Sequence, residues 1–184
     1  KAFPSFGYLL AVAPDHEAAV IRRFTDRKIA PELLRELIQA GQSAATSSHV
    51  QAYSVIHVKN PANRETLAEL AGGQDYIATC SDFLVFCADM HRGQRIAEMR
   101  GKEHVNNTLD TFMNGAVDAS LAMMAFITAA GFKGLGTCPV SAVRAHTAAI
   151  CELLGLPDGV FPVAGLTVGY PTDDGRFTLR LPPS

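Results

Sequence analysis

Apolar side chains along this chain recur with two spacings, one typical of helices and one typical of strands. The leucine and isoleucine positions after Pro31 follow helical spacing, and a proline suits the first turn of a helix. Asn60 followed by Pro61 predicts an N-cap and a first helical residue, and Gly155 predicts a helix end. The pattern predicts four helices, over residues 31–45, 60–71, 112–130 and 146–154.

Three apolar segments are short and rich in β-branched or aromatic residues, which predicts strands over residues 53–58, 83–88 and 161–170. The run 83–88 contains no polar residue and is typical of a central strand covered on both faces. The interval 91–107 is polar and charged and predicts no element. Intermixed helices and strands in 184 residues predict one α+β domain, residues 1–184, with its layers on a sheet.

Composition narrows the classes of protein that fit this pattern. Hydrophobic residues make up 48% and charged residues 18%, as in a compact globular domain. The net charge of −2 provides no excess of positive charge that would attract nucleic acid. Asp118 and Ser120 interrupt the apolar run 116–130, which is short for a membrane span. The first four residues do not resemble a secretory signal. We therefore expect a cytoplasmic protein with neither a nucleic-acid nor a membrane partner.

The reactive side chains do not form a known catalytic or metal-binding arrangement in the sequence. The four cysteines, Cys80, Cys87, Cys138 and Cys151, have no C-x-x-C spacing and no clustered histidines, so we predict no metal site and no redox dithiol. Nor does the sequence suggest a Ser-His-Asp or Cys-His pair. No side chain is therefore predicted to be catalytic.

The segment 134–144, with sequence GLGTCPVSAVR, follows one predicted helix and precedes another. Its two glycines allow the chain to end a helix and reverse tightly. Two interpretations remain open from these residues alone. The segment is either a plain helix connection or a turn that presents backbone N–H groups to a flat ligand with many acceptors.

Six segments stand in the order that is typical of one enzyme family: IRRFTD (21–26), SSHVQAYS (47–54), LAGGQ (70–74), FLVFCAD (83–89), GLGTCPVSAVR (134–144) and GLTVGYP (165–171). With them the chain resembles the nitroreductase/flavin reductase family over residues 20–182. It is most similar to the oxygen-insensitive, NADPH-dependent branch that binds FMN. The resemblance implies a mostly antiparallel central sheet flanked by helices in an intertwined homodimer, with a C-terminal tail from about residue 171 on the partner subunit.

The resemblance also implies which residues bind FMN, while the flavin itself carries the chemistry. Arg22 and Arg180 match the cations at the phosphate, and Gln74 matches the amide at the pyrimidine edge. Thr46, Ser47 and Ser48 match contacts to the ribityl and pyrimidine region. Val140, Ser141 and Ala142 match the segment that lies against the dimethyl-to-N5 side of the ring.

Two departures from the family pattern concern the phosphate. Where relatives read His-Arg-Ser before Ile-Arg, this chain has Ala18, Ala19 and Val20. Where relatives read Lys-x-Arg-Leu-Pro near the end, residues 178–182 read TLRLP, so of the two cations only the arginine remains, as Arg180. Each lost charge-assisted bond is worth about 1.5–3 kcal/mol, so we expect FMN to bind more weakly than in relatives with the full pattern.

The resemblance leads to two hypotheses. In the first, the chain is an FMN-dependent oxidoreductase that passes hydride from NAD(P)H to nitroaromatic, quinone-like or free flavin acceptors, so its partners are NAD(P)H, a small aromatic electron acceptor and a second copy of itself. In the second, it is a degenerate member of the family that serves as a flavin-binding or non-enzymatic binding module. The replacement of the phosphate-binding residues is the feature that separates the two.

Overall fold

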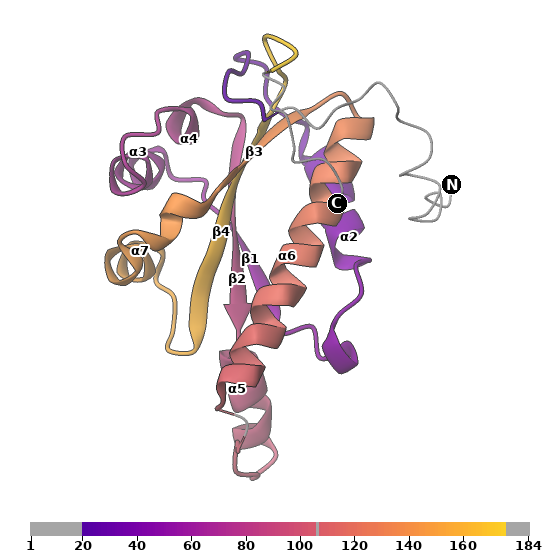
Figure 1. Ribbon diagram of the computed structural model, residues 1–184, viewed down its shortest axis with the longest axis vertical. Coiled ribbons are helices and arrows are strands. Elements are labelled where there is room, and N and C mark those ends of the chain that lie inside the picture. Colours follow the sequence, from indigo (N-terminus) through magenta and orange to yellow (C-terminus); the bar gives the residue numbers. More distant parts are fainter. Residues whose placement is uncertain (1–19, 106, 176–184) are drawn as a thin grey trace, which may run out of the picture.

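The computed structural model describes residues 20–105 and 107–175 (Figure 1). Its elements in chain order are α2 (Pro31–Gln42), η1 (Ser47–His49), β1 (Tyr53–His57), α3 (Pro61–Leu70), α4 (Tyr76–Thr79), β2 (Asp82–Asp89), α5 (His91–Met99), α6 (Leu109–Phe132), β3 (Gly136–Val140), η2 (Ser141–Arg144), α7 (Thr147–Leu154) and β4 (Val160–Gly169).

The four strands form one antiparallel sheet in the order β1-β2-β4-β3. Helices α2 and α6 cover one face, and α3, α4 and α7 lie on the other (Figure 1). Helix α5 projects beyond the end of β2, and none of its residues is buried. The architecture confirms the predicted α+β class with helices on both sides of an antiparallel sheet.

The position of strand β2 explains why residues 83–88 are all apolar, with aspartates only at its two ends. Leu84 and Phe86 enter the core beneath α2 and α6, whereas Phe83, Val85 and Cys87 enter the core beneath α3 and α7. Successive side chains of a strand point to opposite faces, so a strand between two helical layers has no solvent face. The prediction of a central strand covered on both sides is confirmed.

The predicted helices and strands are present, with ends that differ by a few residues. Asn60 caps α3 as expected, because its Oδ1 accepts a hydrogen bond from the Ala62 N–H at 3.0 Å. Gly155 ends α7 in a left-handed conformation with φ of 62°. Helix α2 stops at Gln42 rather than Ala45.

Three elements were not predicted. Helix α5 lies in the interval 91–107, α4 follows Gln74 directly, and the segment 134–144 contains strand β3 before the turn η2. Strand β3 includes Pro139, which has no N–H to donate, and it tolerates this residue because it lies at the edge of the sheet.

Helix α6 has 24 residues, longer than the apolar run that the sequence pattern marked as short for a membrane span. By length and composition alone it would suffice to cross a membrane, so that argument from its length was wrong. The core helix of a globular domain meets the same criterion, and α6 packs with Ala119, Ala122 and Phe126 on the sheet and α2.

Candidate functional site

Two of the predicted FMN-binding side chains, Arg22 and Gln74, each contact Tyr76. The guanidinium carbon of Arg22 lies 5.7 Å from the centre of the Tyr76 ring. The Tyr76 hydroxyl donates a hydrogen bond to Gln74 Oε1. A cation and an amide therefore border one phenol at the start of α4.

The chemical state of this cluster follows from its surroundings. Burial, together with the nearby Cys138 thiol, raises the pKa of Tyr76 to about 12. The phenol is therefore neutral at physiological pH and remains a hydrogen-bond donor. Gln74 Nε2 donates to Ala71 O at 2.6 Å, so both ends of its amide are fixed.

The predicted segment of Val140, Ser141 and Ala142 lies beside this cluster. Cys138, the neighbour of Tyr76, belongs to β3, and β3 leads directly into η2. The Cys138 thiol and the Tyr76 phenol both raise the pKa of Arg22. Val140 is buried at 2% exposure, which leaves its backbone rather than its side chain for a ligand, whereas Ser141 is exposed. The N–H groups at the start of a helical turn have no acceptor within it, so η2 offers donors next to small side chains.

The remaining described segment, Thr46, Ser47 and Ser48, lies on the other side of the sheet. Asp118 of α6 accepts the Ser47 N–H at 2.9 Å and so ties this loop to the layer of α2 and α6. Gln74 and η2 belong to the layer of α3 and α7 (Figure 1). One chain therefore does not bring the two groups of predicted residues together. The buried Thr46 Oγ1 also has no hydrogen-bond partner among the residues that the structure describes.

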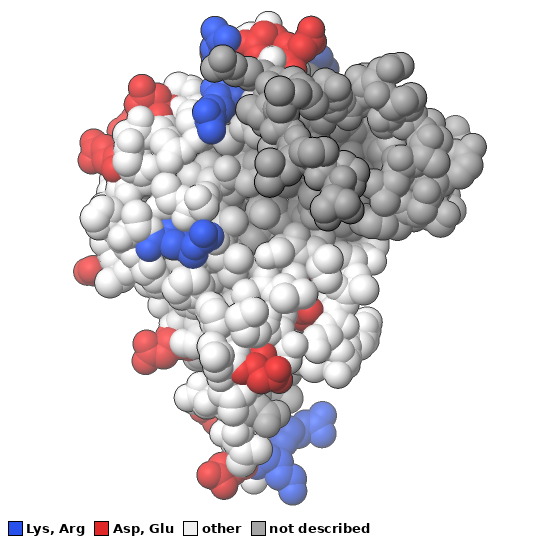
Figure 2. Space-filling view, in the orientation of Figure 1, with Lys and Arg blue, Asp and Glu red and all other residues white. Residues whose placement is uncertain are grey.

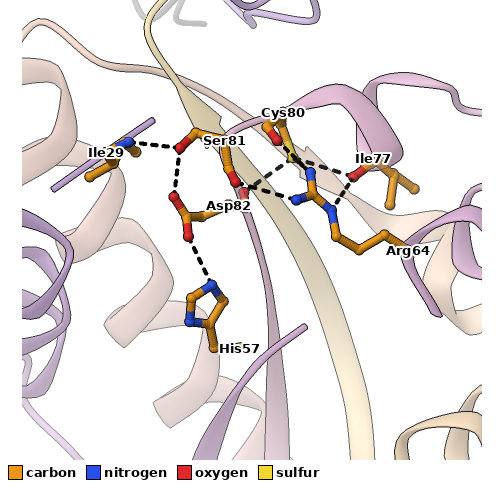
Figure 3. Close-up of polar contacts among 7 residues, drawn as sticks. All are labelled: Ile29, His57, Arg64, Ile77, Cys80, Ser81 and Asp82. Carbon is orange, nitrogen blue, oxygen red and sulfur yellow. Dashed lines mark hydrogen bonds and ion pairs between the residues drawn. The ribbon is translucent and has the colours of Figure 1, made fainter. Parts of the chain in front are cut away.

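A buried arginine fixes the turn that carries Tyr76. Arg64 of α3 points toward the end of α4 and donates from Nε to Ile77 O at 3.0 Å and from Nη1 to Ser81 O at 3.3 Å (Figure 3). Its Nη2 lies against the carbonyl oxygen and the thiol of Cys80. The sequence pattern did not mark Arg64, because a single arginine within a helix is ordinarily exposed.

A polar chain beside Arg64 joins the start of α2 to the sheet (Figure 3). The Ile29 N–H donates to Ser81 Oγ at 2.8 Å, Ser81 donates to Asp82 Oδ2 at 2.7 Å, and His57 Nε2 lies 2.8 Å from Asp82 Oδ1. A nucleophilic triad needs histidine next to serine, whereas here aspartate lies between them. The chain is an anchor for β1, β2 and the segment before α2.

The cysteines do not pair with one another. All four are free, and Cys80, Cys87 and Cys138 are buried. Burial raises the pKa of Cys80 to about 11 and that of Cys87 to about 12, so neither is a reactive thiolate at physiological pH. Across residues 20–105 and 107–175, no three His, Cys, Asp or Glu side chains gather as metal ligands would. Arg180, Ala18 and Ala19 lie outside the described residues.

The comparison with family models decides the classification. The model described as the nitroreductase family matches residues 19–170. The chain belongs to the nitroreductase family. The match includes the cluster of Arg22, Tyr76 and Gln74 as well as the loop of Thr46, Ser47 and Ser48, called the Ser47 loop below.

Relatives with established names agree with this classification. An FMN reductase (NADPH) of Bacillus subtilis is 41% identical over 165 residues, which cover 88% of this chain and 66% of that protein. An oxygen-insensitive NADPH nitroreductase of Salmonella typhimurium is 34% identical over 162 residues, covering 88% and 66%. These names confirm the predicted branch of the family. The chain spans about two thirds of the length of these relatives.

Solved structures confirm the fold. The NfrA1 nitroreductase of B. subtilis superimposes with a TM-score of 0.87 at 39% identity, covering 89% of this chain and 67% of that one. An NADPH:FMN oxidoreductase from Vibrio harveyi, solved in complex with NAD+, gives a TM-score of 0.84 at 33% identity, covering 89% and 67%. The chain therefore has the nitroreductase fold.

Proposed function

We propose that this protein is a homodimeric, FMN-dependent oxidoreductase that transfers hydride from NAD(P)H to nitroaromatic, quinone-like or free flavin acceptors. Membership of the nitroreductase family and the names of the relatives support this activity. Bound FMN would supply the hydride chemistry at its ring. The residues of this chain would bind the ring, orient it and exclude water from one face. The free, buried cysteines agree with a cytoplasmic location.

The cluster of Arg22, Tyr76 and Gln74 is the observation that carries the proposal, because it fits the polar edge of a flavin. The O2, N3 and O4 atoms of that edge alternate between acceptor and donor. The Gln74 amide has one bond at each end within the chain, and it keeps a second N–H and a second lone pair for these atoms. A guanidinium beside the same phenol supplies a positive charge. We therefore propose that Arg22 serves the pyrimidine edge, although the resemblance implied a contact to the phosphate.

The Ser47 loop fits the same flavin only if a second subunit supplies it. Its residues lie on the opposite face of the sheet from Gln74 within one chain (Figure 1). Two copies related by a twofold axis each offer both groups. We propose that Thr46, Ser47 and Ser48 of one subunit complete the site formed by Arg22, Gln74 and η2 of its partner.

Helix α6 offers the surface for this dimer. Large apolar side chains that are 45% or more exposed recur along it at spacings of three or four residues: Leu109, Met113, Val117, Leu121 and Met124. Around the lower part of α6, Figure 2 shows mostly uncharged surface with an acidic patch near the end of the helix, and further charged side chains lie around α5. Such a stripe marks an interaction surface, and we propose a second copy of this chain as the occupant.

A lysine in this stripe should break the dimer. We expect Leu121→Lys to convert the protein to a monomer at micromolar concentration, because the new charge would be buried in an apolar interface. Sedimentation velocity measures the change. Ala62→Lys on α3, exposed on the opposite layer, adds the same charge and should leave the dimer intact. A Leu121→Lys protein that remains dimeric would place the interface elsewhere.

Flavin binding and turnover test the proposed activity directly. The purified protein should quench the fluorescence of added FMN in a saturable titration, and it should then oxidise NADPH or NADH in the presence of a quinone or a nitroaromatic compound. Gln74→Ala should weaken FMN binding. Saturable FMN binding without any oxidation of either nicotinamide would favour the second hypothesis, a flavin-binding module, which the apolar residues Ala18, Ala19 and Val20 motivate. A protein that binds no FMN would overturn the proposed activity.

A further inference from the structure

The loop between α2 and β1 has an unusual backbone conformation. Ser48, His49 and Gln51 have φ values of 48°, 55° and 55°, in the left-handed region that favours glycine. Each such residue costs about 1–3 kcal/mol and persists when the surrounding structure fixes it. All three side chains are exposed. The strain therefore does not serve the packing of these three side chains in the core.

Asp118 fixes both ends of this strained segment. The residue is 1% exposed and lies in the middle of α6. Its Oδ1 accepts the Ser47 N–H at 2.9 Å, and its Oδ2 accepts the Ala52 N–H at 3.1 Å. Hydrogen bonds to a carboxylate are about twice as strong as those between neutral groups. One buried carboxylate thus spans the loop and sets the distance between its ends.

Arg92 of α5 fixes the same loop through its carbonyl groups. Its Nη1 donates to Gln51 O at 3.2 Å, and its Nη2 donates to Tyr53 O at 2.9 Å. Asp89 completes the arrangement, because its Oδ1 accepts the Arg92 N–H and its own N–H donates to Ala52 O at 2.9 Å. Helix α6 also touches the loop directly, since a Cβ on Gly115 would lie 2.8 Å from Ala52 O.

Charged side chains from two helices thus hold four backbone groups of one short exposed loop. We infer that Asp118 and Arg92 are positioning residues that hold the Ser47–Gln51 segment in its binding conformation before a ligand arrives. The inference rests on the proposed function and deepens it, because the ligand is the ribityl and pyrimidine region of FMN in the partner subunit's site. Holding a loop in its bound conformation lowers the entropic cost of binding.

Asp118→Asn tests the inference with almost no change of shape. An asparagine side chain has one acceptor oxygen, and its NH2 group would face one of the two backbone N–H donors. We expect the loop to lose one anchor and FMN to bind about tenfold more weakly or worse. Amide hydrogen exchange in residues 47–52 should become faster. Asp110→Asn on the same helix is the control, since Asp110 is exposed and contacts Asn114, and FMN affinity should stay as in the unmodified protein.

Mixed dimers distinguish a positioning role of Asp118 from a general loss of stability in the variant subunit. A subunit carrying Asp118→Asn is paired with a subunit carrying Gln74→Ala by co-expression with two affinity tags. If the loop acts on the partner's site, one site receives both defects and the other receives neither. We expect one FMN per mixed dimer to bind with the affinity of the unmodified protein, although both parent homodimers bind weakly. A merely destabilised subunit would not restore such a site.

Two outcomes would overturn the inference while leaving the proposed function standing. One is an Asp118→Asn homodimer that binds FMN as tightly as the unmodified protein. The other is a mixed dimer without any tight site. If the unmodified protein itself bound no FMN, the proposed function would fail first, and this inference with it.

Discussion

Replacing Arg64 with alanine should lower the free energy of unfolding by about 3 kcal/mol. The substitution removes the arginine donors from three buried carbonyl groups, those of Ile77, Cys80 and Ser81. Ile77 O keeps the Cys80 thiol as a weak donor, and each buried group left without a partner costs about 1–3 kcal/mol. The lost side chain also leaves a cavity beneath α4. For a domain of this size the melting temperature should fall by about 6–12 °C. Differential scanning calorimetry measures the change.

The matched control is Arg100→Ala, which removes the same side chain from an exposed position at the end of α5. Surface substitutions of this kind usually change stability by less than about 0.5 kcal/mol. Arg64→Lys should fall between the two, because it keeps the charge but not the forked donors. An Arg64→Ala protein that melts with the unmodified one would mean that water or a neighbouring group satisfies the three carbonyls equally well.

Arg64→Ala should also weaken flavin binding, because α4 begins two residues after Gln74. Tyr76 is the first residue of α4 and bonds to Gln74, while Arg64 bonds to the carbonyl oxygen of Ile77, the next residue of this four-residue helix. Stability and ligand binding are therefore linked through one element. Flavin affinity of Arg64→Ala is best measured well below its melting temperature, where the folded state is fully populated.

The sequence predicted the parts of the fold that depend on local pattern. Strand β2 was predictable because the two helical layers that cover it require apolar residues at positions 83–88. The start of α3 was predictable because Asn60 and Pro61 act on their own neighbours. Helix α5 was not, since none of its residues is buried and its sequence therefore lacks a core-facing stripe. Strand β3 was hidden by Pro139, which only an edge position tolerates.

The candidate site was predictable as a set of residues but not as an arrangement in space. Arg22 and Gln74 both contact Tyr76, although the resemblance assigned them to opposite ends of FMN, and the Ser47 loop lies across the sheet from them. Strand order decides which face each segment occupies, and no local pattern reveals strand order. Asp118 was noticed in the sequence as a break in an apolar run, yet its partners lie 71 and 66 positions away. Its role depends on tertiary contacts.

Restoring the family pattern at residues 19 and 20 should strongly tighten FMN binding. Ala19→Arg combined with Val20→Ser would add a cation and a hydroxyl ahead of Ile21. Ile21 is buried and bonds through its N–H to Thr137 O at 3.0 Å, while Val20 and Arg22 on either side of it are exposed. Two charge-assisted bonds are worth about 2–4 kcal/mol after solvent exposure is discounted. The dissociation constant should therefore fall by about 30-fold to several hundredfold.

Riboflavin provides the control, because it carries the same ring and ribityl chain without the phosphate. The double substitution should leave riboflavin affinity almost unchanged in the same fluorescence titration. Arg22→Ala separates the two roles considered for this residue. Equal losses of affinity for FMN and riboflavin would support a contact of Arg22 with the pyrimidine edge, where Tyr76 and Gln74 lie. A loss of affinity for FMN alone would support a contact of Arg22 with the phosphate. If the double substitution strengthened both ligands equally, residues 19 and 20 would not lie at the phosphate, and the alignment of this segment with the family pattern would be wrong.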